Sequence, residues 1–183
     1  MSLVVIEGLS GVGKTTLAPR LAAELNADFI PSIPPEFAAT RIAIDAQRNV
    51  ETRHLFYLTA LAATSSIILP RIEYGENILL ESYFDRAQAF HLAMGSAVSI
   101  NVSFFVQPDL VIVLECEEEV RLQRLRERTS SRLSYWHHQT ERSVERIRAY
   151  YDTLAAAEHL DSSTALEPLL KAATKLAKRR ISV

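Results

Sequence analysis

Short apolar runs and longer stretches of mixed polarity alternate along this chain, which predicts strands separated by helices. Apolar runs typical of buried parallel strands lie at residues 3–6, 77–81 and 109–115, and weaker strands are predicted at 29–30 and 159–161. Helices are predicted at 16–25, about 51–69, 83–94, 120–128, 141–157 and the C-terminal segment, with a polar stretch at 129–139. The alternation indicates an α/β fold.

Five strands joined by right-handed helical crossovers predict one parallel sheet flanked by helices. No internal repeat or low-complexity linker interrupts the pattern, so we expect a single domain over residues 1–183. Ligands of such sheets bind at the carboxyl ends of the strands, where we expect the functional site.

A glycine-rich motif follows the first predicted strand. Residues 8–15 spell G-x-x-x-x-G-K-T without a mismatch, and three of the chain's 5 glycines lie within them. A strand before the motif and a helix after it are the context that a phosphate-binding loop requires. The motif predicts a nucleoside triphosphate site with ATP and Mg²⁺.

Each position in this loop has an expected role. Backbone amides of residues 11–16 face the phosphates, Lys14 bridges the β- and γ-phosphates, and the Thr15 hydroxyl holds Mg²⁺. The residues expected to bind the nucleotide here are Gly8, Ser10, Gly11, Val12, Gly13, Lys14, Thr15 and Thr16.

Composition narrows the class of protein. With 48% hydrophobic residues and a net charge of −2, the chain has no general attraction for nucleic acid or anionic membranes, and we expect a cytoplasmic protein. The single cysteine, Cys116, excludes an intramolecular disulfide and is expected to be a buried thiol. The uncharged stretch between Arg53 and Arg71 contains Pro70 and several Ser and Thr residues, so we expect a buried helix that could lie at a dimer seam, and no membrane span.

Further motifs occur in a fixed order. They are Ile6-Glu7-Gly8, Gly13-Lys14-Thr15-Thr16, Pro108-Asp109-Leu110, the arginine-rich segment 120–128, the E-R-x-R-x-x-Y segment 145–151 and Leu160-Asp161. Through them the chain resembles, nearly end to end, the thymidylate kinase group of P-loop kinases, with kinship to deoxynucleoside kinases. The resemblance implies a kinase that uses ATP and Mg²⁺, and a homodimer joined by helices.

The resemblance also implies a lid over the triphosphate at about residues 128–140. Arg124, Arg128 and Arg132 would belong to it and supply positive charge to the transferring phosphoryl group, with Arg128 as the catalytic arginine. The alternative for these arginines is a solvated helix face paired with the neighbouring acidic residues.

The chain differs from that group at the positions that would bind the phosphoryl acceptor, the molecule that receives the phosphoryl group. Thymidylate kinases carry Asp-Arg where this chain has Glu81-Ser82, and R-E-P-G where it has residues 32–35, so two arginines that clamp the acceptor's phosphate are missing. Ala60 takes the place of the arginine that reads thymine, Phe56 keeps the place of the stacking ring, and Ser10 replaces an aspartate. Losing two charge-assisted contacts weakens binding of a dianion by a factor of several hundred or more.

These departures favour a hydroxyl acceptor, such as a nucleoside-like metabolite. Glu81 resembles the glutamate that deoxynucleoside kinases use as a base, and it could also contact Mg²⁺. The alternative is a nucleoside monophosphate kinase of thymidylate kinase type, in which Arg86 replaces the missing clamp. A non-catalytic ATP-binding subunit is the alternative from another class.

Other residues are predicted to contact a small-molecule acceptor, and plain core packing is the alternative for each aromatic. The catalytic set is Lys14, Glu81 and Arg128, and the metal set is Thr15 and Glu81. The acceptor set is Glu36, Phe37, Phe56, Tyr57, Tyr83 and Arg86.

Overall fold

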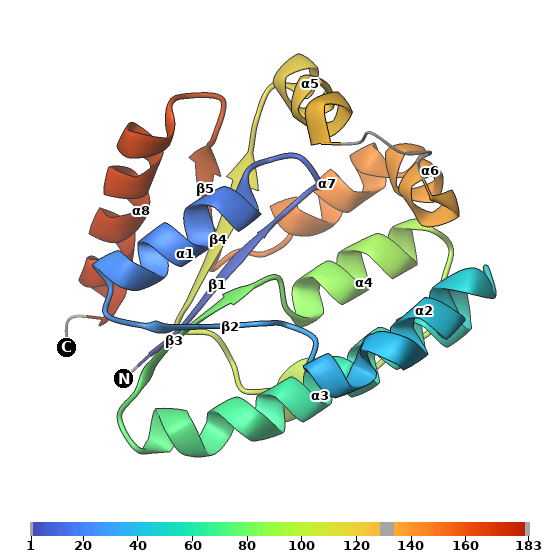
Figure 1. The fold of residues 1–183 in the computed structure, drawn as a ribbon, viewed down its shortest axis with the longest axis horizontal. Coiled ribbons are helices and arrows are strands. Elements are labelled where there is room, and N and C mark those ends of the chain that lie inside the picture. The colour runs from blue at the N-terminus through green and yellow to red at the C-terminus, as the bar shows by residue number, and fades with distance from the viewer. Residues whose placement is uncertain (1, 129–133, 182–183) are drawn as a thin grey trace.

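The computed structural model describes residues 2–128 and 134–181 and contains a five-stranded parallel sheet (Figure 1). Its strand order is β2-β3-β1-β4-β5. The strands are β1 (Ser2–Gly8), β2 (Asp28–Ile30), β3 (Asn77–Glu81), β4 (Leu110–Glu115) and β5 (Glu158–Asp161). Every pairing is parallel. The predicted five-stranded α/β fold is therefore confirmed.

Helices cover both faces of the sheet (Figure 1). On one face, α1 (Lys14–Glu24) packs beside α8 (Leu166–Ile181). On the other face, α4 (Phe84–Ala93) lies between α3 (Val50–Glu73) and α7 (Val144–Asp152). All seven residues of β1 are buried, since this central strand has covered faces on both sides.

Two short helices were not predicted from the sequence. The first, α2 (Ala38–Ala46), buries none of its residues, although its sequence contains Ile42 and Ile44. The second, α6 (Tyr135–Glu141), lies where we predicted a polar stretch and buries only Trp136 and Thr140. Its first turn is capped by the Ser134 hydroxyl, which accepts a hydrogen bond from the amide of His137.

Helix α3 is the longest in the part of the chain that the structure describes. By length and composition alone, it is the one described helix that is long and apolar enough to cross a membrane. It packs against β3 and α4. Its outer face still exposes Leu55, Ile67 and Leu69.

The phosphate-binding loop between β1 and α1 approaches its neighbours too closely for a side chain at two of its glycines. A Cβ on Gly8 would lie 2.4 Å from the carbonyl oxygen of Leu114. A Cβ on Gly11 would lie 2.9 Å from the Arg121 carbonyl oxygen and 2.9 Å from Leu125 Cγ on α5 (Glu118–Arg128). Both glycines have positive φ. The loop thus packs directly on β4 and α5.

Replacing Gly11 by alanine separates the effect of this close approach from that of backbone conformation. Gly75 has the same φ of +92° but nothing within 4 Å of its Cβ direction, so Gly75→Ala is the matched control. We expect Gly11→Ala to lower the free energy of unfolding by about 1–3 kcal/mol more than Gly75→Ala, because the added methyl overpacks the loop against α5. Urea unfolding measures the difference. Equal losses in the two variants would contradict the close packing.

Candidate active site

The phosphate-binding loop places its two chemical groups at the carboxyl edge of the sheet. The Lys14 ammonium donates to the carbonyls of Gly8 at 2.9 Å and Leu9 at 2.7 Å. The Thr15 hydroxyl donates to Glu81 Oε1 at 2.8 Å, which joins the start of α1 to the end of β3. A hydroxyl and a carboxylate at this distance are the hard oxygen donors that Mg²⁺ prefers, so the donor set fits that ion.

A cavity of about 1100 Å³ opens beside this loop. It brings together many of the residues predicted from the sequence, from the loop, α3, β3 and α4. Those lining it are Ser10, Gly11, Gly13, Lys14, Thr15, Tyr57, Glu81, Tyr83 and Arg86. This volume lies at the upper end of the range for clefts that bind small molecules.

Three predicted acceptor residues do not line this cavity. Phe56 is buried, and its ring packs edge-on against Phe37 with centroids 6.1 Å apart. Glu36 precedes Phe37 in a single 3₁₀ turn, Pro35–Phe37. The cavity wall of α3 is formed instead by Arg53, Tyr57 and Leu61, which are spaced four residues apart.

On the donor side, Arg124 lies beside the loop. A Cβ on Gly13 would lie 3.8 Å from Arg124 Nη1, and Arg124 Nη2 donates to the carbonyl of Ser162 at 2.8 Å. The Ser162 hydroxyl in turn donates to the Val12 carbonyl at 2.7 Å. Arg128 ends α5, but its side chain and all of Arg132 lie outside the described residues.

Arg86 reaches into the cavity from the first turns of α4. Its Nη1 donates to the Gly8 carbonyl at 2.8 Å, its Nη2 to the Ser10 hydroxyl at 3.3 Å, and the guanidinium lies 3.9 Å from the centroid of Phe90. The neighbouring Ser82, where the resembling kinases carry arginine, has a φ of +74°. The Arg86 guanidinium therefore places a positive charge next to the phosphate-binding loop, although residue 82 is an uncharged serine.

Glu7 lies buried beneath Arg86. It accepts hydrogen bonds from the amides of Tyr83 at 2.7 Å and Arg86 at 3.3 Å, at the start of α4, and from the Tyr151 hydroxyl at 3.3 Å. Burial, then the charge of Asp85, raises the pKa of Glu7 to about 8. Burial also raises the pKa of Asp85 to about 6. The carboxyl of Glu7 thus fixes the end of α4 that carries Arg86.

Sequence reasoning missed a second group of cavity residues, at the far end from the loop. The group surrounds Arg53 of α3, and we call it the Arg53 cluster: Arg53, Asp45, Tyr57, His91 and Trp136, of which only Tyr57 was predicted to contact the acceptor. Arg41 and Arg48 also line this end of the cavity. Asp45, Arg41 and Arg48 come from α2 or the turn after it, and Trp136 from α6. We did not assign these residues of α2 and α6 to the site, because we predicted neither helix from the sequence.

A buried arginine ties α5 to the loop and to α6. Arg121 is fully buried, and its guanidinium donates to the Ser10 carbonyl at 3.2 Å and to Glu141 Oε1 at 3.0 Å. It also pairs with Glu118 at 2.6 Å. Arg121 therefore connects the donor loop to the helix that covers the acceptor side.

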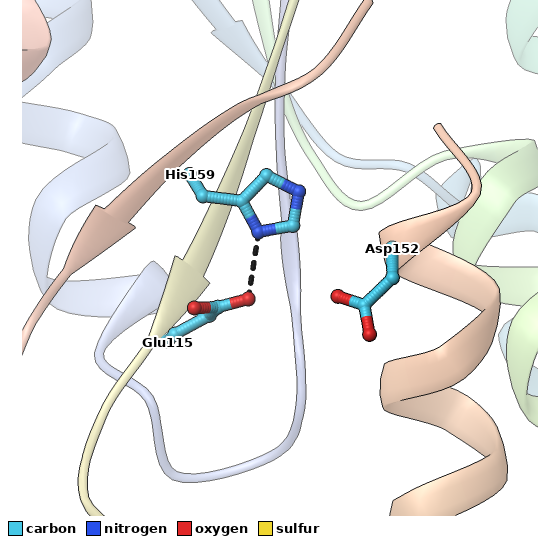
Figure 2. Close-up of side chains that lie close together, drawn as sticks. All are labelled: Glu115, Asp152 and His159. Carbon is cyan, nitrogen blue, oxygen red and sulfur yellow. Dashed lines mark hydrogen bonds and ion pairs between the residues drawn. The ribbon is translucent and has the colours of Figure 1, made fainter. Parts of the chain in front are cut away.

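One cluster away from this cavity has metal-ligating chemistry. Ligand atoms of Glu115, Asp152 and His159 lie within 4.8 Å of one another, and all three residues are exposed (Figure 2). His159 Nδ1 and Glu115 Oε1 are 2.6 Å apart, an interaction that joins the neighbouring strands β4 and β5. The structure supports this strand pairing and gives no further sign of an ion.

Cys116 follows β4 and is half-buried. Burial raises the pKa of its thiol, which is the opposite of what a nucleophilic cysteine requires.

Comparison with known proteins identifies the family of this chain. The family model for thymidylate kinase matches residues 6–174. A thymidylate kinase from Xanthomonas campestris pv. campestris is 30% identical over 93% of this chain and 80% of its own length, and one from Leptospira borgpetersenii is 29% identical over 85% and 82%. The chain belongs to the thymidylate kinase family, and it is therefore an enzyme, an ATP-dependent nucleotide kinase.

A solved structure shares the fold. Deoxyadenosine kinase from M. mycoides, with bound dATP, superposes with a TM-score of 0.70 at 17% identity, over 100% of both chains. The likeness supports the P-loop kinase fold over the entire chain.

The raised pKa of Glu7 predicts a pH-dependent stability. Its folded-state pKa of about 8 exceeds the ordinary value of 4.5, so the native state holds a proton that the unfolded state releases between these values. The stabilisation is complete below about pH 4.5 and is lost as pH rises through about 8, with a slope of at most about 1.4 kcal/mol per pH unit.

We expect Glu7→Gln to remove this component, so that the wild-type free energy of unfolding falls more steeply than that of the variant between pH 5 and pH 8. Urea unfolding across this range measures both. Glu24→Gln, on the exposed surface of α1, is the control and should parallel the wild type. Parallel curves for wild type and Glu7→Gln would disprove the shifted pKa.

Proposed function

We propose that the protein is a nucleoside monophosphate kinase whose acceptor phosphate binds Arg86. The observation that supports this most directly is the position of the Arg86 guanidinium, in the cavity and bonded to Gly8 and Ser10 of the phosphate-binding loop. An anionic acceptor brought to this loop needs its charge neutralised there. Arg86 supplies from α4 the charge that Ser82 lacks.

The charges around the cavity support the same acceptor. Among the lining residues that the structure describes, five are cations and two are carboxylates: Lys14, Arg41, Arg48, Arg53 and Arg86, against Asp45 and Glu81. A net positive cavity suits two phosphorylated substrates better than ATP and a neutral alcohol. Family membership favours the same alternative over the hydroxyl acceptor that we predicted first.

Glu81 has a different role in this proposal from that of a base. Its carboxylate accepts from the Thr15 hydroxyl, and these two oxygen groups would together hold Mg²⁺. Mg²⁺ would neutralise charge on the transferring phosphoryl group there. A phosphate acceptor is already ionised and needs no base, and Glu81 would then help Thr15 to hold the ion.

On the donor side, the loop amides and Lys14 would bind the phosphates of ATP, and Arg124 lies where it can contact the nucleotide beside Gly13. We include in this proposal the catalytic role predicted for Arg128. An enzyme with these substrates is expected in the cytoplasm.

An ADP-release assay over nucleosides and nucleoside monophosphates tests the acceptor. We expect monophosphates, thymidylate first among them, to accelerate ADP release, and nucleosides to leave it at the background rate. Arg86→Met should raise the KM for the monophosphate about 10- to 100-fold, because it removes a charge-assisted contact to the phosphate.

The control is Arg20→Met, since Arg20 lies exposed on α1 and pairs with Glu167. Its KM should match the wild type, and the KM for ATP should change little in either variant. Acceleration by nucleosides alone would establish the hydroxyl acceptor instead.

We also propose a homodimer that buries the outer face of α3. This face exposes Leu55, Ile67 and Leu69, and no charged residue occurs between Arg53 and Arg71. A helix of 24 residues is about 36 Å long, enough to provide much of a stable interface with a second copy.

Sedimentation equilibrium tests this arrangement. The wild type should sediment as a dimer, and Ile67→Lys should shift it to the monomer, because a lysine in the seam would be desolvated without a partner. Ile42→Lys, on the exposed surface of α2, should leave the dimer intact. A monomeric wild type would rule the arrangement out.

A further inference from the structure

The Arg53 guanidinium is held in the cavity wall by polar groups from three helices. Its Nε donates to Asp45 Oδ1 at 2.7 Å, its Nη1 lies 2.8 Å from His91 Nε2, and its Nη2 donates to the Tyr57 hydroxyl at 3.2 Å. These bonds come from α2, α4 and α3. Only 13% of the Arg53 side chain is exposed.

His91 can receive this bond because its ring is fixed as a neutral tautomer. Its Nδ1 lies 2.7 Å from the carbonyl oxygen of Ala87, so Nδ1 carries the proton and Nε2 accepts from Arg53. Burial and the charge of Arg53 lower the pKa of His91 to about 3. The ring therefore stays an acceptor at neutral pH.

Trp136 of α6 also contacts the Arg53 guanidinium. The Arg53 guanidinium carbon lies 4.5 Å from the Tyr57 ring centroid and 4.7 Å from that of Trp136, so it is close to both rings. The indole N–H of Trp136 also donates to the backbone carbonyl of Asp45 at 2.7 Å. Trp136 thus contacts both members of the Arg53–Asp45 ion pair.

The position of this cluster relative to Arg86 suggests which part of the acceptor it meets. His91 lies five residues after Arg86 on α4, about 7.5 Å along the helix axis at 1.5 Å per residue. Because Asp45 balances its charge, Arg53 suits an uncharged hydrogen-bond acceptor, such as a nucleobase carbonyl, better than a second dianion. Two of its five N–H groups are not used by these contacts.

We propose that Trp136 is a positioning residue that holds Arg53 for the base end of the acceptor, so that acceptor binding depends on the docking of α6. This deepens the proposed function and rests on it for the identity of the acceptor. The connection of α6 to the donor loop runs through Glu141 and Arg121, at the other end of the same short helix. One helix therefore contacts both halves of the site.

The first test needs no substrate. Trp136 is the only tryptophan of the chain, so intrinsic fluorescence reports on it alone. We expect Arg53→Met to increase quenching of this fluorescence by acrylamide, because α6 loses its contact with the guanidinium. Arg20→Met should leave the quenching unchanged. Unchanged quenching in Arg53→Met would overturn the proposed docking contact.

The second test measures kinetics with thymidylate and ATP. Trp136→Ala should raise the KM for thymidylate about tenfold and Trp136→Phe less, because phenylalanine keeps a ring beside Arg53 but loses the indole N–H. The KM for ATP should change little, which also shows that the variants are folded. His138→Ala, at an exposed position of α6 outside the cavity, should behave as the wild type.

The two proposals fail in different ways. If thymidylate is a substrate but the KM for it is unchanged in Trp136→Ala, the positioning role is wrong and the proposed function stands. If no nucleoside monophosphate is a substrate of the wild type, the proposed function is wrong, and the base-end assignment of Arg53 falls with it.

Discussion

The close packing of the phosphate-binding loop on β4 and α5 is the constraint on which the rest of the site depends. Gly8 and Gly11 allow the backbone to approach Leu114 and Arg121, and any side chain there would collide. From this loop, Thr15 reaches Glu81 on β3, and Gly8 and Ser10 accept bonds from Arg86 on α4. A single backbone segment thus sets the positions of the donor site, the metal-binding groups and the cation proposed for the acceptor.

Charge is arranged around that loop at two depths. Beneath it, the buried carboxyl of Glu7 fixes the first turn of α4 through backbone amides. Above it, the described cavity wall carries more guanidinium groups than carboxylates. The charge of Arg53 is balanced by Asp45, whereas the guanidinium of Arg86 donates to the Gly8 carbonyl and the Ser10 hydroxyl of the loop. This difference separates a place for a phosphate from a place for an uncharged ring. These two places follow one another along α4, because Arg86 lies near its start and His91, which bonds to Arg53, lies near its end.

Sequence patterns were sufficient for the sheet and for the donor loop, because buried parallel strands and the glycine motif are strong local signals. They were not sufficient for α2 and α6, which bury almost nothing, and these two helices contribute much of the acceptor wall. Phe56 is an example: the resemblance placed it at the acceptor, whereas Arg53, Tyr57 and Leu61 are the residues of α3 that line the cavity. Which side of a helix faces a cavity follows from packing against other elements, and no local pattern in α3, uncharged over most of its length, specifies it.

The central claim is that the phosphoryl group is transferred to a phosphate and not to a hydroxyl. Phosphorus NMR of the product formed from ATP and the accepted nucleotide distinguishes the two, because the new bond is a phosphoanhydride in one case and a phosphate ester in the other. We predict paired, mutually coupled resonances of a nucleoside diphosphate. A new monoester resonance, without an anhydride other than those of ATP and ADP, would contradict the account.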